Sequence, residues 1–212
     1  MMRSLVPALA IALAIALVAC SEAPDATVAT APAPGVVPDA DRPDLAGDWV
    51  WEVDEAASTL AFSGTQNGEG FRGEFTDWEA AVRLDPDDLD DAWIDVRVGL
   101  ASARTGDRDR DEALPSRDWF DATRYPHARF RSSEVTHEGR DDYRARGTLS
   151  IRGVSRPVVL PFTLDIDGTR ARARGALDLD RSDYGVGQGE FASDTWIAFP
   201  VRVEIDVVAE RE

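Results

Sequence analysis

The chain has no lysine, a single cysteine (Cys20) and two histidines (His127 and His137). One cysteine excludes a disulfide within the chain. The histidines have no cysteine or glutamate at ligand spacing, so no zinc or metalloprotease motif is formed. The chain also lacks a G-x-S-x-G nucleophile elbow. We therefore predict a protein that is not an enzyme and has no metal site, no catalytic residue and no cofactor.

Positive charge is scarce as well. Asp and Glu total 40 against 23 basic residues, all of them arginine, and the formal net charge is −17 at pH 7. An acidic surface disfavours binding to nucleic acid and to anionic lipid head groups. We predict no nucleic-acid partner, and we expect any attachment to a membrane to come from a lipid anchor.

The N-terminus has the features of an export signal. Arg3 precedes an apolar run from Leu5 to Val18, which is short for a membrane-spanning helix. The run ends in LVAC (17–20), which resembles the lipobox of bacterial lipoproteins, and the alternative is an ordinary signal peptide with a chance cysteine. The resemblance implies a signal peptide over residues 1–19 and an acylated Cys20 that anchors the protein to a membrane. Because Ser21 follows instead of Asp, it also implies a periplasmic protein attached to the outer membrane.

Residues 20–47 are rich in Ala, Pro, Asp, Thr and Val and show no period of 2 or 3.6. Such a composition predicts an extended, flexible tether. Residues 48–212 have the length of one ordinary domain, long enough to bury a core without disulfides.

Strict alternation of apolar and polar residues dominates this domain. It recurs in residues 60–62, 71–75, 78–84, 92–100, 130–135, 143–151, 158–166, 171–179 and 197–207. A period of two places each apolar set on one face of a strand, as in antiparallel sheets with one dry face. The parity changes at Thr76 and Asp77, which predicts a bulge or bend in one long strand. Turns are expected at PD (86–87), EG (138–139), RG (152–153) and DG (167–168).

About eight strands joined by short connections predict a sheet that closes into a barrel, because closure removes exposed edges. A barrel of that size encloses one ligand. Residues 104–121 interrupt the alternation, and Asp107 to Leu114 within them predict a short helix that stops before Pro115. A transmembrane barrel would alternate in the same way, but it would also carry aromatic girdles, which this chain lacks. The predicted fold class is all-β, an eight-stranded antiparallel barrel with one short helical segment.

Four motifs follow one another in the domain: RDEALPSRDWFD (110–121), YPHARF (125–130), GTLSIRGVSRPV (147–158) and RSDYGVG (181–187). With the opening WEVD (51–54), they resemble the YceI-like family of polyisoprenoid-binding proteins over Trp51 to Ala209. The resemblance implies an elongated, lipocalin-like barrel with a long apolar tunnel for a polyisoprenoid or a quinone-like tail. Many members carry a histidine where this chain has Ala113, so that side chain is missing from the tunnel mouth.

We predict that the protein is a non-catalytic periplasmic carrier of a long apolar isoprenoid-type lipid. One alternative is an envelope-stress lipoprotein that acts through its acidic surface. A less favoured one is an enzyme acting on the bound lipid, with Asp111, Asp118, His127 or Arg181 at the cavity mouth. Strand parity and the aromatic pair at 119–120 predict these ligand-binding residues: Phe62, Phe75, Trp78, Ile94, Val96, Trp119, Phe120, Phe130, Leu149, Ile151, Phe162 and Leu164.

Trp119 and Phe120 lie outside the predicted strands, and surface loops rarely carry such a pair without burying it. We expect the pair to cap one end of the tunnel, held there by Asp118 or Asp121 through backbone hydrogen bonds or through pairing with Arg110. A cap residue has fewer contacts than a core tryptophan. Trp119→Ala is therefore expected to speed ligand exchange more than it lowers stability, unless Trp119 belongs to the plain core.

Overall fold

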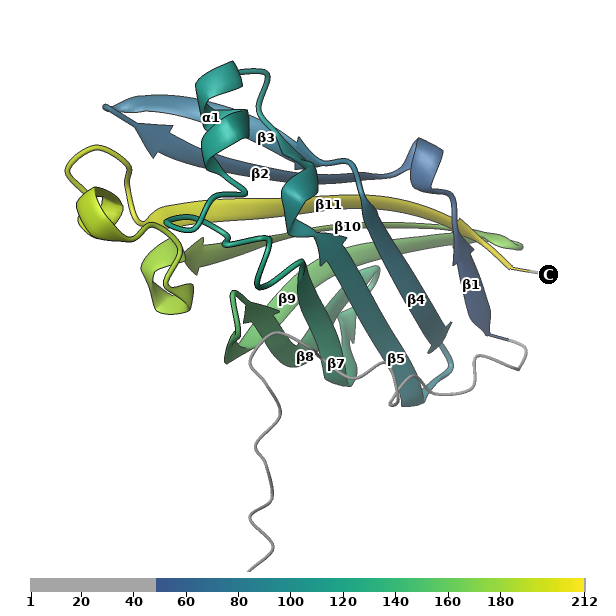
Figure 1. Cartoon of the computed structure of the whole chain (residues 1–212). Coiled ribbons are helices and arrows are strands. Elements are labelled where there is room, and N and C mark those ends of the chain that lie inside the picture. The colour runs from purple at the N-terminus through teal and green to yellow at the C-terminus, as the bar shows by residue number, and fades with distance from the viewer. Residues whose placement is uncertain (1–48, 212) are drawn as a thin grey trace, which may run out of the picture. The chain divides into compact units, whose positions relative to one another are not determined.

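Residues 49–211 are described in the computed structural model, and their strands form one antiparallel sheet that closes into a barrel (Figure 1). The long strands are β2 (Thr59–Gln66), β3 (Glu69–Phe75), β4 (Trp78–Asp85), β5 (Asp88–Gly99), β7 (His127–Gly139), β8 (Asp142–Ile151), β9 (Val154–Asp167), β10 (Arg170–Asp180) and β11 (Pro200–Glu210). Strands β1 (Val50–Val53) and β6 (Ala103–Arg104) are short. The predicted signal peptide, Cys20 and the tether lie outside the described residues.

The predicted bend is confirmed. It divides one strand of the eight-stranded barrel into two labelled strands, β3 and β4. The chain bends at Thr76 and Asp77, so that β3 pairs with β2 while β4 pairs with β5. Counted as one bent strand, β3 and β4 complete an eight-stranded barrel with β2, β5 and β7 to β11. Strand β1, which the sequence did not predict, pairs with both β4 and β11 and closes the barrel between them.

The helical content agrees with the prediction at the interrupted segment. Helix α1 (Arg108–Ala113) begins after Asp107, whose side chain accepts a hydrogen bond from the Arg110 amide, and it ends at Leu114. Such a cap satisfies an amide that the first helical turn leaves unpaired. Short 3₁₀ helices occupy η2 (Glu55–Ala57), η3 (Leu100–Ser102), η4 (Arg181–Tyr184) and η5 (Gly189–Phe191).

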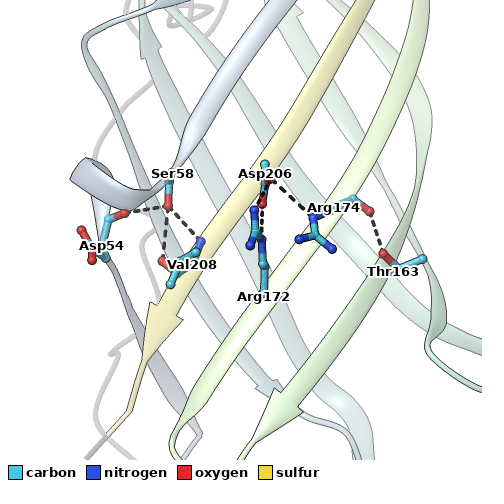
Figure 2. Close-up of polar contacts among 7 residues, drawn as sticks. All are labelled: Asp54, Ser58, Thr163, Arg172, Arg174, Asp206 and Val208. Atoms are coloured by element: carbon cyan, nitrogen blue, oxygen red, sulfur yellow. Dashed lines mark hydrogen bonds and ion pairs between the residues drawn. The ribbon is translucent and has the colours of Figure 1, made fainter.

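The junction between β1 and β2 depends on Ser58 (Figure 2). The last pair between β2 and β11 is Thr59 with Asp206, so the Val208 amide beyond it needs another acceptor. The Ser58 hydroxyl accepts that hydrogen bond at 2.9 Å and donates to the Asp54 carbonyl at 2.6 Å. The Ser58 side chain therefore links the start of β2 to β11 just beyond the last backbone pair between the two strands.

The outer face of the barrel carries the charged residues of the alternating pattern. On β10 and β11, Arg172 donates two hydrogen bonds to Asp206, at 2.7 and 2.6 Å, and Arg174 reaches the same carboxylate (Figure 2). The hydrogen bond from Arg172 lowers the pKa of Asp206 below its ordinary value. Ion pairs this exposed to solvent are weak, so they make the outer face hydrophilic more than they stabilise it.

Three sequence-based boundaries were wrong. The last strand was expected from Ile197, but β11 begins at Pro200, because the carbonyls of Ile197 and Ala198 accept hydrogen bonds from the Arg181 guanidinium instead of from a strand. The hairpin turns expected at 138–139 and 167–168 lie one or two residues later, since β7 and β9 extend through Gly139 and Asp167. The other two turns lie where they were expected.

Candidate ligand-binding cavity

The barrel encloses a cavity of about 280 Å³. Its wall is formed by the inward residues of the long strands, and at one end by two loops. All of the residues predicted to bind ligand line it: Phe62, Phe75, Trp78, Ile94, Val96, Trp119, Phe120, Phe130, Leu149, Ile151, Phe162 and Leu164. Their role in binding stays a prediction, but strand parity placed each of the strand residues on the correct face.

The wall is apolar over nearly its whole area. Arg129 and Arg181 are its only charged members among the described residues. The Arg129 side chain forms an ion pair with Asp95, whose neighbours Ile94 and Val96 are the inward residues of β5. Further lining residues belong to alternating sets that the sequence placed on one face, namely Leu60, Leu177, Leu179, Val201, Val203, Ile205 and Val207. Such a lumen has almost nothing with which to hydrogen-bond a polar guest.

One end of the cavity lies beside β1. Trp51 is 4% exposed, lines the cavity and donates from its indole nitrogen to the Leu84 carbonyl at 2.9 Å. The Arg211 guanidinium lies 3.8 Å from the centre of the neighbouring Trp49 ring. The Trp49 ring lies beside that of Trp51, with the two ring centres 6.4 Å apart, so two packed indoles lie at this end of the cavity.

The other end is covered by two loops, which we call the helix loop (residues 105–126) and the glycine loop (residues 181–199). Both lie at the end of the barrel that carries α1, away from β1 and the C-terminus (Figure 1). Four apolar side chains of these loops form one buried cluster with Phe62 and with Ala103 of β6: Leu114, Trp119, Tyr184 and Val186. The cavity therefore extends from a strand-borne tryptophan to a loop-borne one.

The helix loop is shaped by its own backbone and by Asp111. The Asp111 carboxylate accepts hydrogen bonds from the amide and the hydroxyl of Thr105, both at 2.7 Å, and these bonds lower its pKa. After α1, a series of tight turns includes hydrogen bonds from the Trp119 amide to Ser116 and from the Phe120 amide to Leu114. These turns point the Trp119 and Phe120 side chains into the cavity wall.

The glycine loop is organised around Arg181, which is only 5% exposed. Its guanidinium donates to the backbone carbonyls of Val186, Ser193, Ile197 and Ala198 at 2.8 to 3.1 Å. The group also lies over the ring of Trp119, 5.5 Å from its centre. Burial lowers the pKa of Arg181, yet an arginine remains charged at neutral pH. The buried guanidinium thus supplies the hydrogen bonds that water would otherwise donate to the carbonyls of this loop.

Glycine is needed in this loop for conformation as well as for space. Gly185, Gly187 and Gly189 all have positive φ, a backbone conformation that glycine adopts most readily. Gly187 also packs on the guanidinium, because a Cβ there would lie 2.1 Å from Arg181 Nη1. The loop can therefore wrap the arginine closely enough for four carbonyls to converge on it.

The two loops are tied together by Arg152, from the turn between β8 and β9. It donates to the Gly185 carbonyl at 2.9 Å and to the Arg117 carbonyl at 2.7 Å. The Gln188 amide adds a hydrogen bond to the Asp118 carbonyl, and Trp119 packs on Phe191 with ring centres 5.1 Å apart. The loops thus form one cover. The sequence places Arg152 only in a turn, and the one feature that could have pointed to its role is its position inside the GTLSIRGVSRPV motif.

Two details of the predicted cap differ in the structure. Trp119 is 7% exposed, as buried as the core aromatic residues, so it does not have the sparse contacts expected of a cap residue. Arg110 contacts Gln66, Thr105 and Asp107 instead of Asp118 or Asp121, because α1 turns its guanidinium toward the β2–β3 hairpin. The backbone of Asp118 does hold the segment, through the hydrogen bond from Gln188.

The residues considered for catalysis do not assemble into a cluster at the cavity. Within the described residues, only Arg181 of the four lines the wall, and its nitrogens are already bonded to backbone carbonyls. Asp111 is occupied by Thr105, and His127 is exposed at the start of β7. Across residues 49–211, no group of three or more His, Cys, Asp and Glu side chains is placed to hold a metal ion. No helix in that range is long and apolar enough to cross a membrane.

Sequence relatives share this domain. The chain is 28% identical over 149 residues to the UPF0312 protein of Pseudomonas savastanoi pv. phaseolicola, covering 67% of this chain and 78% of that protein. It is 35% identical over 96 residues to the UPF0312 protein plu2095 of Photorhabdus laumondii, covering 45% of this chain and 50% of that protein.

Solved structures share the fold. BcnA of Burkholderia cenocepacia superposes with a TM-score of 0.72 at 30% identity, covering 74% of this chain and 99% of BcnA. A polyisoprenoid binding domain from Saccharophagus degradans superposes with a TM-score of 0.61 over 78% of this chain and all of that domain. At 16% identity, this second likeness shows a common fold alone.

The YceI-like domain matches residues 51–209 of the chain. This range includes the cavity wall, the helix loop, the glycine loop and the Arg152 tie between them. The protein therefore belongs to the YceI-like family.

Proposed function

We propose that the protein binds the apolar chain of an isoprenoid-type lipid, such as a polyprenyl or quinone tail, in the barrel cavity and carries it without chemical change. The observation behind this proposal is the nearly unbroken apolar wall from Trp51 to Trp119 inside a barrel with a charged outer face. Apolar cavities exclude water and accept apolar guests. The named polyisoprenoid binding domain with the same fold supports the choice of lipid.

The experiment is extraction of the protein after purification from its own host, followed by mass spectrometry of the bound lipid. Ala173→Phe would fill the lumen from β10, whereas Arg174→Phe adds the same ring one residue along on the outer face. We expect an isoprenoid lipid in the wild type and in Arg174→Phe, and a strong loss in Ala173→Phe. Thermal melts establish that both variants are folded. Phospholipid background alone, or equal recovery from both variants, would refute the proposal.

We further propose that the domain acts in the periplasm, tethered by an acylated Cys20 to the outer membrane. The support is the LVAC motif at 17–20 and the Ser after it. Cys20→Ser is expected to abolish acylation and to leave an uncleaved precursor or a soluble form. Labelling cells with radioactive palmitate and fractionating them measures both effects. Label that still enters the Cys20→Ser protein would show that the lipobox interpretation is wrong.

The acidic surface is a weaker basis for function. The net charge of −17 would suit an envelope protein that acts through its surface, but such a protein has no need of an apolar cavity. An enzyme acting on the lipid would need polar groups around the lumen. The chief polar group of the wall is the Arg181 guanidinium, which already donates hydrogen bonds to backbone carbonyls. The carrier is thus the function that the cavity supports best.

A further inference from the structure

Phenylalanine and glycine face one another across neighbouring strands inside the barrel. Gly64 is opposite Phe71, Phe62 is opposite Gly73, and Phe162 is opposite Gly175. In each pair, a Cβ placed on the glycine would come within 3.0 Å of the phenylalanine side chain. At Gly64 and Gly73 the nearest atoms of the phenylalanine belong to its ring, so these two rings lie against bare backbone, along the wall.

Gly64 differs from the other inward glycines in what surrounds it. A Cβ at Gly73, Gly147 or Gly175 would also meet a backbone oxygen, at 2.7, 2.3 and 2.6 Å respectively. At Gly64, the three nearest atoms all belong to the Phe71 ring, the closest at 2.9 Å. A methyl group at this position would thus press on one movable ring and on no backbone.

The Gly64–Phe71 pair marks where the apolar lumen ends on this wall. Both residues line the cavity. The next inward residue on β2 is Gln66, whose side chain accepts a hydrogen bond from Arg110 at 2.6 Å. Beyond Phe71 the β2–β3 hairpin presents Gln66 and its partner Arg110 instead of an apolar side chain, so an apolar chain gains little by reaching further along this hairpin.

The Phe71 ring is also restrained on one side. The Arg110 guanidinium lies 4.6 Å from the ring centre and is itself held by Gln66 and Thr105. Phe62 packs edge-on against the ring, with the two ring centres 6.4 Å apart. If a methyl group at position 64 displaced the ring, Arg110 would block its movement away from the barrel, which leaves movement into the lumen.

We propose that Gly64 and Phe71 together set the length of isoprenoid chain that the cavity accepts. The ring is the stop at the end of the lumen, and the missing side chain of Gly64 lets it lie flat. This inference rests on the proposed function. Gly64→Ala should therefore favour shorter chains, and Phe71→Ala should favour longer ones, in opposite directions from the wild type.

The test offers the full-length protein an equimolar mixture of prenyl alcohols of graded length, from farnesol to decaprenol. Bound alcohol is extracted and quantified by mass spectrometry. Gly70→Ala is the matched control, because Gly70 lies on the same hairpin and a Cβ there meets no atom within 4 Å. We expect the ratio of long to short chains to change about fourfold in each variant. This is the change in binding that corresponds to burying one methylene group more or less, at ~0.8 kcal/mol. The ratio should stay unchanged in Gly70→Ala.

Two readouts separate this inference from the proposed function. Wild-type protein that binds none of the alcohols would refute the proposed function and the inference with it. Wild-type protein that binds them, with Gly64→Ala and Phe71→Ala giving the wild-type ratio or shifting it in the same direction, would refute the inference alone. If Gly64→Ala does not melt cooperatively, Phe71→Ala decides: a shift toward longer chains supports the stop, and an unchanged ratio overturns it.

Discussion

Replacing Arg181 by methionine is expected to lower the free energy of unfolding by about 3 to 5 kcal/mol, because it removes the hydrogen-bond donors of several buried carbonyls at once. The methionine fills part of the same space but leaves four carbonyls of the glycine loop without donors. Each unsatisfied buried polar group costs about 1 to 3 kcal/mol, so the loop is expected to open to water instead of bearing the full cost.

Hydrogen exchange locates this effect, and urea denaturation measures its size. The amides of Val186, Gln188 and Phe191 all donate to backbone carbonyls in the closed loop, and they should lose protection. Arg156→Met is the control, since Arg156 also donates to a carbonyl of this region, that of Asp183, but its side chain is about half exposed. A change of about 1 kcal/mol or less is expected there. Full protection of the loop amides in Arg181→Met would show that the guanidinium is not what closes the loop.

Truncation of the two cavity tryptophans is expected to have equal effects on stability and unequal effects on ligand exchange. Trp51 and Trp119 are 4% and 7% exposed and line opposite ends of the lumen. Each tryptophan-to-alanine change should cost about 3 to 5 kcal/mol. Trp51 is fixed to a strand, whereas Trp119 is carried by a loop and packs on Phe191 of another loop. Loops open locally more easily than strands of a closed sheet.

We therefore expect Trp119→Ala to speed ligand release by about tenfold or more, since 1.4 kcal/mol of lost contact between the loops corresponds to tenfold. Trp51→Ala should leave the release rate near that of the wild type. Transfer of a fluorescent prenyl analogue from protein to excess lipid vesicles measures the rate, and urea denaturation of the same samples measures stability. Faster release in both variants, or in Trp51→Ala alone, would show that the cover over Trp119 is not the exit.

Local rules account for what could be predicted from the sequence. A period of two is a property of the strand itself, so the inward positions Ile94, Val96, Leu149 and Ile151 could be identified without knowing which strands pair. The short helix predicted within Asp107 to Leu114 is local in the same sense, because it depends on that segment and on Pro115 after it. The number of alternating segments also predicted the barrel, and the YceI-like resemblance then supplied its elongated form and the expected ligand class, because the motifs keep their order and spacing.

The remaining features depend on residues far apart in the chain. Strand β1 pairs with the edge of β4 that β5 does not occupy and with the end of β11 that lies beyond β2. The Ser58 hydroxyl accepts from the Val208 amide because the pairing of β2 with β11 has already ended at Asp206. The hydrophobic periodicity of the sequence does not reveal such unpaired strand edges, because they depend on where the pairing between strands ends in the closed sheet.

Sequence alone determined that this protein has an alternating, inward apolar face and two motif-bearing loops. Only the tertiary structure decided what those loops do. In the sequence, Arg181 does not differ from the other arginines, and its role appears only when the fold brings four carbonyls around it. Gly64 merely interrupts an apolar strand face in the sequence, and only the strand register places Phe71 opposite it. Alternation depends on neighbours in sequence, whereas a buried cation and a ring over glycine depend on which strands and loops meet across the barrel.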